Sequence, residues 1–278
     1  MTLAAVDRRS AAPDDTVRTI IDTVRADGVC VVPGVLSKAA CAAHVATLER
    51  AVQDQIRKGE YFGSRTTQVL YNYFVHDDSL FELMAHPLID AVMTTLIDKD
   101  YVLISPSARN PRIRPELPEG VKVSGEGWHI DSRVANPATG ELFKPSLGYY
   151  AVVALEDFTR ENAATKYIPR SHLMFKKPPD READLEHSVL IAEAGSMVFF
   201  DPAFWHRTGV PTTTSRWSVF NMYGPWFMKP YFRFAENYSK EKLKALPPLV
   251  QQLLHLRSVP PVNANVRSST VTAEPVFD

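Results

Sequence analysis

The 278-residue sequence predicts a mainly β protein with flanking α-helices. Between about residues 100 and 225, short apolar and aromatic runs alternate with loops rich in Gly, Pro, Asn and Thr, which is typical of a sandwich or barrel. No helix-length segment separates these runs, which argues against a doubly wound parallel sheet. We expect one domain, residues 1–278, that comprises a helical N-terminal support over about 14–98, a β core over about 100–225, and a C-terminal helical extension and tail over about 229–278.

The N-terminal region is predicted to be helical, with a single strand inserted. Residues 14–26 start with two aspartates and then carry apolar residues at helical spacing. The run "GVCVVPGVL" indicates a short apolar strand, and Ser37 is placed to cap the long helix that follows. The apolar stripe expected on this helix comprises Cys41, Val45, Leu48, Val52 and Ile56. A further helical stretch is expected from Asp77, with an interruption at Pro87.

The β core is expected to consist of short strands. The runs that predict them are "YVLIS", "GYYAVVAL", "TKYIP", "HSVLIAE", "SMVFFD" and "RWSVFNMYG". The Pro-rich segment 107–124 indicates a long loop that enters a strand at "GWHID", residues 127–131. After residue 228, a helical patch is expected around "QQLLHL", followed by a polar tail.

The composition argues against several classes of protein. The 31 Lys and Arg residues nearly balance the 32 Asp and Glu residues, so no overall charge favours nucleic acid or an anionic membrane as partner. Two cysteines, Cys30 and Cys41, cannot form a disulfide framework. The N-terminus lacks an apolar signal region, and no stretch approaches the roughly 18 apolar residues of a membrane span. We therefore expect a soluble, cytoplasmic protein, and no pattern indicates its oligomeric state.

Three residues have the composition of a metal site. His129 and Asp131 are two apart, and residues i and i+2 of a strand point to the same face, so both could reach one ion. Such a pair also arises often by chance on a surface strand. His206 in "GSMVFFDPAFWHRTGV" supplies a third ligand, and two histidines with one carboxylate are the facial triad of non-haem Fe(II) sites. Zinc accepts the same ligands, although structural zinc prefers a closed set of four.

Arg216 follows His206 by ten residues, in the run "RWSVFNMYG". Strand alternation places Arg216 and Ser218 on a face that is otherwise apolar. A guanidinium in such a place needs an anionic partner, because an unpaired buried charge costs several kcal/mol. That partner is either an acidic side chain or the carboxylate of a co-substrate, which suits the two-pronged geometry of arginine.

The order His129-x-Asp131, His206, Arg216 resembles that of the Fe(II)- and 2-oxoglutarate-dependent oxygenases of the phytanoyl-CoA dioxygenase type. The resemblance covers roughly residues 28–225 and includes the segments "GVCVVPGVLS" and "ENAATKYIPRSH". Ala163 and Arg170 stand where glycines are usual in that family. These departures fall in turns and leave the ligands intact, so they affect local loop shape rather than chemistry.

The resemblance implies a double-stranded β-helix, the cupin-like jelly roll, with helices packed outside. It implies that His129, Asp131 and His206 are the catalytic metal ligands for Fe(II), and that Arg216 pairs with the distal carboxylate of 2-oxoglutarate. O2 is then the second co-substrate, and a C–H bond of a small-molecule metabolite is hydroxylated or otherwise oxidised with release of succinate and CO2. Apart from the resemblance, a composition rich in Ala, Arg, Val and Pro suggests specialised metabolite biosynthesis as the setting. The alternatives are a cupin-like metal-dependent isomerase or hydrolase, and a non-catalytic jelly-roll binding module.

Further residues are weaker candidates for the site. Contacts to the co-substrate are expected from Ser218, Thr165 and Asn72. Residues that flank the ligands and are expected to line a substrate pocket, unless they are structural, are Glu126, Trp128, Arg133, Tyr149 and Trp205. His172 is expected to stabilise its turn rather than bind metal. The sequence names no substrate, and the loops expected to carry specificity are 60–75, 107–126 and 133–146.

Overall fold

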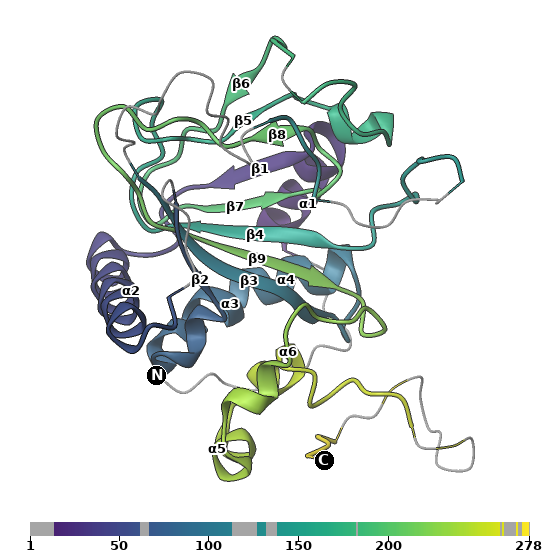
Figure 1. Ribbon diagram of the computed structural model, residues 1–278. Helices are drawn as coiled ribbons and strands as arrows, with labels where there is room; N and C mark the ends of the chain where they lie inside the picture. Colours follow the sequence, from purple (N-terminus) through teal and green to yellow (C-terminus); the bar gives the residue numbers. More distant parts are fainter. Residues whose placement is uncertain are drawn as a thin grey trace.

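Two antiparallel sheets form the centre of the protein, and helices cover the larger of them (Figure 1). The structure is a computed structural model that describes residues 14–61, 67–112, 127–131, 138–181, 183–261, 263, 271 and 274–277. The large sheet has the strand order β1-β7-β4-β9-β3-β2, and the small sheet has the order β6-β5-β8. Every one of these strand pairs is antiparallel, as expected for a sandwich.

The strands are short and occupy most of the predicted runs. Their bounds are β1 Val29–Val32, β2 Thr67–Tyr71, β3 Val102–Pro111, β4 Tyr149–Ala154, β5 Lys166–Tyr167, β6 Ser188–Val189, β7 Met197–Phe200, β8 His206–Arg207 and β9 Ser218–Gly224. The α-helices are α1 Asp15–Asp27, α2 Lys38–Lys58, α3 Glu82–Ala85, α4 Pro87–Leu96, α5 Lys240–Ala245 and α6 Pro248–Leu253. Short 3-10 helices are η1 Tyr73–Val75, η2 Asp78–Phe81, η3 Ser171–Met174 and η4 Phe234–Asn237.

Local sequence explains where the first two helices begin and end. The Asp14 carboxylate caps α1 by accepting a hydrogen bond from the Val17 amide at 2.8 Å. Gly28 ends α1 in the left-handed conformation, with φ 88°. The Ser37 hydroxyl caps α2 by accepting from the Ala40 amide at 3.1 Å. Both helix starts agree with the sequence prediction.

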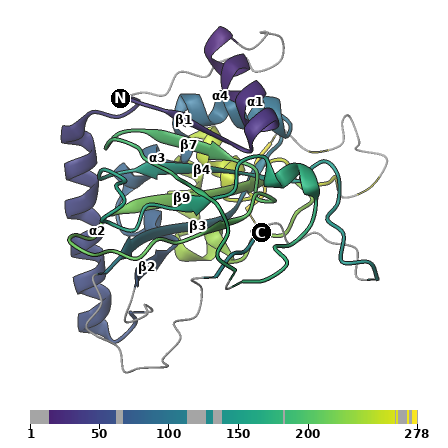
Figure 2. The same cartoon turned by 90° about the horizontal axis from the view of Figure 1, so that it is seen from above.

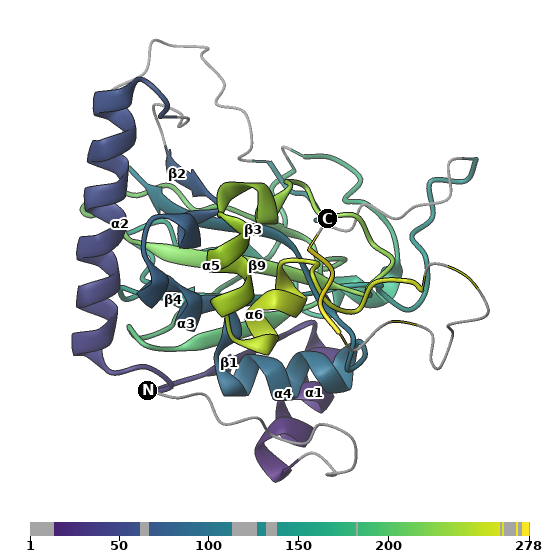
Figure 3. The same cartoon turned by 90° about the horizontal axis from the view of Figure 1, so that it is seen from below.

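The two faces of the large sheet pack against different partners. Seen from below, its outer face is covered by α1, α3, α4 and α6 (Figure 3), whereas α2 runs across one end of the strands (Figures 2 and 3). In β9, Val219 and Tyr223 join the outer cluster, and Phe220 and Met222 point toward the small sheet. The predicted alternation of this strand is therefore confirmed. Because β9 begins at Ser218, Arg216 lies just before the strand.

Gly195 joins the entry of α2 to the start of β7. Its φ of 89° lies in the left-handed region, and a Cβ at this position would collide with the Leu36 carbonyl oxygen. The Gly195 carbonyl accepts hydrogen bonds from the amides of Val35 and Leu36, at 3.0 and 2.9 Å. This close approach sets the position of β7, whose far end leads to His206.

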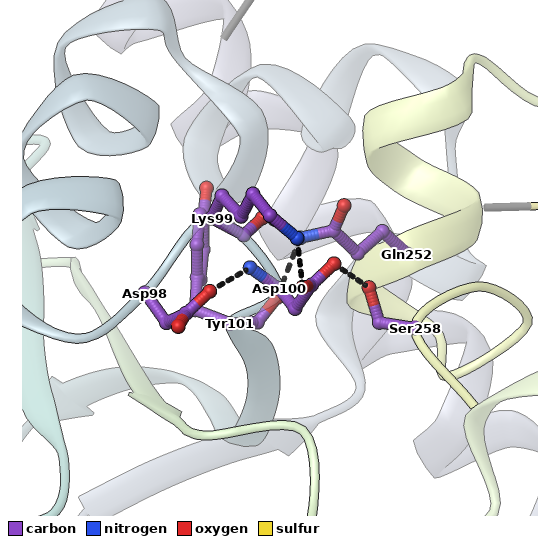
Figure 4. Close-up of polar contacts among 6 residues, drawn as sticks. All are labelled: Asp98, Lys99, Asp100, Tyr101, Gln252 and Ser258. Atoms are coloured by element: carbon purple, nitrogen blue, oxygen red, sulfur yellow. Dashed lines mark hydrogen bonds and ion pairs between the residues drawn. The ribbon is translucent and has the colours of Figure 1, made fainter. Parts of the chain in front are cut away.

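The C-terminal segment is anchored to the turn that begins β3 (Figure 4). The Gln252 amide donates hydrogen bonds to the carbonyl oxygens of Lys99 and Tyr101, at 3.0 and 2.8 Å. The Ser258 hydroxyl donates to the Asp100 carboxylate at 2.9 Å, and Lys99 forms an ion pair with the same carboxylate. These contacts hold the start of β3. The other end of this strand carries residues that line the cavity described below.

Two predictions about the β region are wrong. β3 continues to Pro111, so residues 107–111 of the expected Pro-rich loop are strand, while 113–124 lie outside the described residues. The reason is tertiary, because β3 is inserted between β9 and β2 and pairs with both. β2 itself is a strand that the sequence did not indicate. The "GWHID" segment is not a strand and forms an isolated bridge at His129.

One prediction about the helical region is also wrong. Ile56 is 48% exposed, so the buried stripe of α2 ends at Val52, because the last turns of this helix face solvent. The helical patch predicted around "QQLLHL" is confirmed as α6, whose Val250 and Leu253 are fully buried against the N-terminal helices. None of the helices in the described part of the chain has both the length and the apolar character needed to cross a bilayer.

Candidate metal centre

His129, Asp131 and His206 meet between the two sheets. Their ligand atoms all lie within 4.8 Å of one another. Asp131 Oδ2 is 3.5 Å from His206 Nε2, and Asp131 Oδ1 is 4.0 Å from His129 Nε2. The rings of the two histidines have their centroids 4.2 Å apart. Within the part of the chain that the structure describes, this is the one cluster of metal-binding side chains.

Backbone pairing brings these distant segments together. His129 and His206 form an antiparallel bridge in which each amide donates to the other's carbonyl oxygen, at 2.9 and 3.0 Å. The Asp131 amide donates to the Pro202 carbonyl oxygen at 2.8 Å. The two segments therefore lie in a defined register. This register brings the side chains of His129 and Asp131 close to His206, although their segment is not a regular strand.

Hydrogen bonds orient both imidazole rings toward the centre. His129 Nδ1 is 2.8 Å from the Gly127 carbonyl oxygen, and His206 Nδ1 is 3.1 Å from the Phe204 carbonyl oxygen. A carbonyl oxygen only accepts, so Nδ1 carries the proton in each ring and Nε2 has a free lone pair. The His206 ring also stacks on Phe204, with centroids 4.8 Å apart. Both Nε2 atoms are thus prepared to bind a metal ion.

The electrostatics of the cluster favour the protonation states that bind metal. Burial and the neighbouring His206 lower the pKa of His129 to about 4, so this ring is neutral near pH 7. Burial acts to raise the pKa of Asp131, but its close contacts with His206 and His129 and the charge of Arg109 lower it below its usual range. A neutral imidazole beside an ionised carboxylate is the form in which these residues act as ligands.

Arg216 lines the same cavity as the three candidate ligands. It is 2% exposed, and its guanidinium carbon lies 3.7 Å from the centroid of the Phe158 ring. Its terminal nitrogens donate to the Ser218 hydroxyl at 2.8 Å and the Ala163 carbonyl oxygen at 2.9 Å, while Nε has no partner. Burial lowers the pKa of Arg216 to about 9. The charge of Glu156 acts in the opposite direction, but among the described residues no carboxylate forms an ion pair with Arg216.

Of the three other residues predicted to contact the co-substrate, two line the cavity and one does not. Ser218 is fully buried, lines the cavity and holds Arg216, and Thr165 lines the cavity from the side of the small sheet. Asn72 does not line it. Asn72 lies just after β2, has a left-handed backbone with φ 50°, and starts η1. The predicted contact of Asn72 with the co-substrate is therefore not supported, and Thr67 of β2 lines the cavity instead.

The residues predicted to line a substrate pocket fill other roles where the structure describes them. Trp128 is buried, and its indole donates to the Ala183 carbonyl oxygen at 2.9 Å. Trp205 donates from its indole to the Lys176 carbonyl oxygen at 2.7 Å. Tyr149 packs into the outer cluster, on the face of β4 that points away from the cavity. Glu126 and Arg133 lie outside the described residues.

His172 is buried, and its Nε2 contacts the Arg25 carbonyl oxygen at 3.0 Å. It lies in η3 and is not one of the three clustered ligands, as its expected role in the turn requires. The two turns that lack the usual glycines keep a glycine-like shape, because Ala163 has φ 69° and Arg170 has φ 61°.

Several cavity residues were missed by the sequence analysis. They are Thr67, Ser105, Ser107, Arg109, Tyr150, Thr208 and Phe220. Tyr150 stacks on Phe200 with ring centroids 4.6 Å apart, and burial together with the nearby Asp131 carboxylate raises its pKa well above the ordinary value. The alternation of β4 separates Tyr149 from Tyr150 but does not say which of the two faces the ligands. A polar residue at every second position, from Ser105 to Arg109, was the signal for the inward face of β3.

Comparison with known proteins places the chain in a family. Residues 24–217 match the model described as phytanoyl-CoA dioxygenase (PhyH). The chain belongs to this family. A curated relative is the dioxygenase af480 of Aspergillus fumigatus, 31% identical over 138 residues that cover 47% of this chain and 42% of that protein. The match thus spans less than half the length of the fungal protein.

Solved structures share the family fold at low identity. HygX from Streptomyces hygroscopicus, with nickel and 2-oxoglutarate bound, has a TM-score of 0.60 and 16% identity, over 80% of this chain and 94% of that chain. The epimerase SnoN in complex with Fe3+, alpha ketoglutarate and nogalamycin RO has a TM-score of 0.55 and 20% identity, over 77% of this chain and 86% of that chain. The predicted cupin-like jelly roll with flanking helices is confirmed.

Proposed function

We propose that this protein is an Fe(II)- and 2-oxoglutarate-dependent dioxygenase that oxidises a C–H bond of a small-molecule metabolite. The observation that carries the proposal is Arg216, a buried cation with no ion-pair partner among the described residues, in the same cavity as the His129, Asp131 and His206 cluster. A metal site alone is compatible with many reactions, whereas a metal site with a buried arginine suits a ligand that carries a carboxylate.

The donor set fits Fe(II). Two neutral imidazole nitrogens and one carboxylate suit a divalent ion, and three protein ligands leave positions open for a co-substrate and O2. In this assignment His129, Asp131 and His206 hold the ion, and the carbonyl oxygens of Gly127 and Phe204 fix the two rings. When bound, the iron and 2-oxoglutarate supply the oxidant for the C–H bond, with release of succinate and CO2.

The protein's own contribution is to bind and orient. Arg216 would take the distal carboxylate of 2-oxoglutarate, with Ser218 holding the guanidinium and Thr165 as a further hydroxyl at the cavity wall. Phe158 packs against the Arg216 guanidinium and Phe220 lines the cavity, so both rings would limit the access of water. The intact Asp131 ligand supports hydroxylation or a related oxidation rather than halogenation, which requires a position vacated by the carboxylate.

The substrate is proposed only by class. SnoN is named with nogalamycin RO, and HygX has also been solved with hygromycin B, and this chain shares their fold. A small molecule of specialised metabolism is therefore the proposed substrate, with no nucleic acid or membrane as partner. A cytoplasmic location is proposed because Cys30 and Cys41 are both free thiols.

The test is anaerobic binding. Addition of Fe(II) and 2-oxoglutarate to the metal-free protein should produce the visible absorption band of the iron chelate, and air should then yield succinate at a substrate-dependent rate. A cupin-like isomerase or hydrolase predicts turnover that needs neither 2-oxoglutarate nor O2. A binding module predicts no chelate band. Either result would contradict the proposed function.

A further inference from the structure

A second arginine enters the cavity beside the metal cluster. Arg109 of β3 lines the same cavity as Asp131 and Arg216. In the pairing of β3 with β9, Arg109 lies opposite Ser218, the residue whose hydroxyl accepts from Arg216. Opposed residues of antiparallel strands project to the same face of the sheet. Arg109 therefore points to the inner face, although the sequence analysis did not identify it.

The guanidinium of Arg109 is oriented but not neutralised. Its Nε donates to the Ser107 hydroxyl at 3.1 Å, and its central carbon lies 5.5 Å from the centroid of the Phe220 ring. Within the described part of the chain, its two terminal nitrogens have no hydrogen-bond partner and no carboxylate lies within ion-pair distance. The Arg109 side chain is exposed to solvent. One edge of the group is thus held while the two-pronged edge stays free to bind an anion.

The charges of the occupied site leave Arg109 without a counterion. The charged side chains on the described wall of the cavity are Asp131, Arg109 and Arg216, and an imidazole that binds a metal ion does so in its neutral form. The two positive charges of a divalent metal and the one of Arg216 balance Asp131 and the two carboxylates of 2-oxoglutarate. Arg109 then adds one uncompensated positive charge to a cavity that already holds metal and co-substrate.

We infer that Arg109 is a specificity residue that binds an anionic group, a carboxylate or a phosphate, on the primary substrate. The inference rests on the proposed function, because the charge balance assumes that metal and 2-oxoglutarate are bound. Arg109 lines the same cavity as the triad, so an anion held there anchors the substrate beside the metal. The inference predicts that acids are bound in preference to neutral molecules of the same shape.

Three variants separate this role from others. Arg109→Gln removes the charge and keeps most of the length, and Arg109→Lys keeps the charge without the fork. Arg112→Gln is the matched control, because Arg112 lies three residues further on, is exposed, hydrogen-bonds to Gln68 at 3.1 Å and does not line the cavity. All three proteins are compared with wild type by melting temperature before binding is measured.

The first measurement is 2-oxoglutarate affinity, from the anaerobic chelate band with Fe(II). It should be the same within about threefold in wild type and all three variants. The second uses protein loaded with Ni(II) and 2-oxoglutarate and a panel of matched probes, observed by ligand NMR. The probes are aliphatic and aromatic carboxylic acids with their primary amides, and sugar and aryl phosphates with the parent alcohols.

Wild type and Arg112→Gln should bind at least one acid more tightly than its neutral partner, and the class of that acid distinguishes carboxylate from phosphate. Arg109→Gln should lose about 10-fold to 100-fold in affinity for that acid, the range for a hydrogen bond to a charged group, without a change for the neutral partner. Arg109→Lys should retain part of the preference, which a merely structural role would not predict.

The failure of the inference is distinguishable from that of the proposed function. Absence of the chelate band in wild type contradicts the function itself. A normal band with no acid preference in wild type, or with a preference that survives Arg109→Gln, overturns only the role of Arg109. A fall in 2-oxoglutarate affinity in Arg109→Gln comparable to that in an Arg216 variant would show that Arg109 binds the co-substrate, and would also overturn it.

Discussion

Replacing Arg216 with methionine should separate co-substrate binding from protein stability. The guanidinium is 2% exposed, and burial lowers its pKa to about 9 from an ordinary value of 12.5. A drop of this size corresponds to an unfavourable burial free energy on the order of 5 kcal/mol for the charged form. Methionine removes that cost and keeps most of the side-chain volume.

The substitution also removes favourable contacts of Arg216, and their summed free energy is similar in size to the burial cost. The hydrogen bonds to Ser218 and Ala163 contribute about 1 to 3 kcal/mol each, and the contact with Phe158 about 1 to 2 kcal/mol. The free energy of unfolding without ligands should therefore change by no more than about 3 kcal/mol in either direction. The affinity for 2-oxoglutarate should fall by about 30-fold to several-thousand-fold, because its distal carboxylate loses its charged partner.

The assay combines anaerobic titration of the Fe(II) chelate band with denaturant unfolding. Wild type should gain about 2.7 kcal/mol of stability at a 2-oxoglutarate concentration 100 times its Kd, and Arg216→Met should gain almost nothing at that concentration. Arg112→Met is the control, since Arg112 lies outside the cavity and should behave as wild type. A well-folded Arg216→Met protein that kept wild-type affinity for 2-oxoglutarate would refute the role assigned to this arginine.

Four further predictions follow from individual residues. Asp131→Ala should abolish turnover and weaken Fe(II) binding at least 10-fold, as measured by equilibrium dialysis. Because the Asp131 carboxylate is intact in the wild-type protein, that protein should form no chlorinated product in chloride buffer. Tyr150→Phe should weaken metal binding by about 3-fold to 10-fold through loss of its contact with Asp131, whereas Tyr149→Phe should not, because that ring faces the outer cluster. Arg170→Gly should raise the free energy of unfolding by about 0.5 to 1 kcal/mol, since φ 61° is strained for arginine, and an unchanged or lower melting temperature would contradict this. The metal-free protein should lose stability as pH falls from about 6.5 toward 4, because unfolded His129 binds a proton in this range and the folded residue does not. Burial also lowers the pKa values of His76, His86 and His255, so His129→Gln should reduce the slope of this part of the stability curve without removing it.

Much of the site follows from sequence because its chemistry is tied to residue type. Two histidines, a carboxylate and a distant arginine have few uses together, and the structure brings His129, Asp131, His206 and Arg216 into one cavity. The helix caps were also predictable, because an N-cap is a contact between residues three positions apart. The division of residues 1–278 into support, core and extension stays a prediction.

The parts that failed are those where both sides of an element are buried. All six residues of β4 are buried, so its pattern could not show that Tyr150 rather than Tyr149 faces the ligands. β3 contains Pro111, one of the prolines that indicated a loop over 107–124, yet it is held as a strand by neighbours on both edges. Asn72 was predicted as a polar contact to the co-substrate, but it lies in the left-handed turn after β2 and does not line the cavity.

The sequence by itself indicated the candidate ligand set, the arginine expected to bind the co-substrate, and the β-rich class, because these depend on residue type and local spacing. Only the tertiary structure decided which residues share the cavity, because that depends on the register between strands distant in the chain. The antiparallel bridge of His129 with His206 completes the metal cluster, and the pairing of Arg109 with Ser218 places a second cation beside it. No local pattern encodes either pairing, since each is selected by the packing of the whole sandwich.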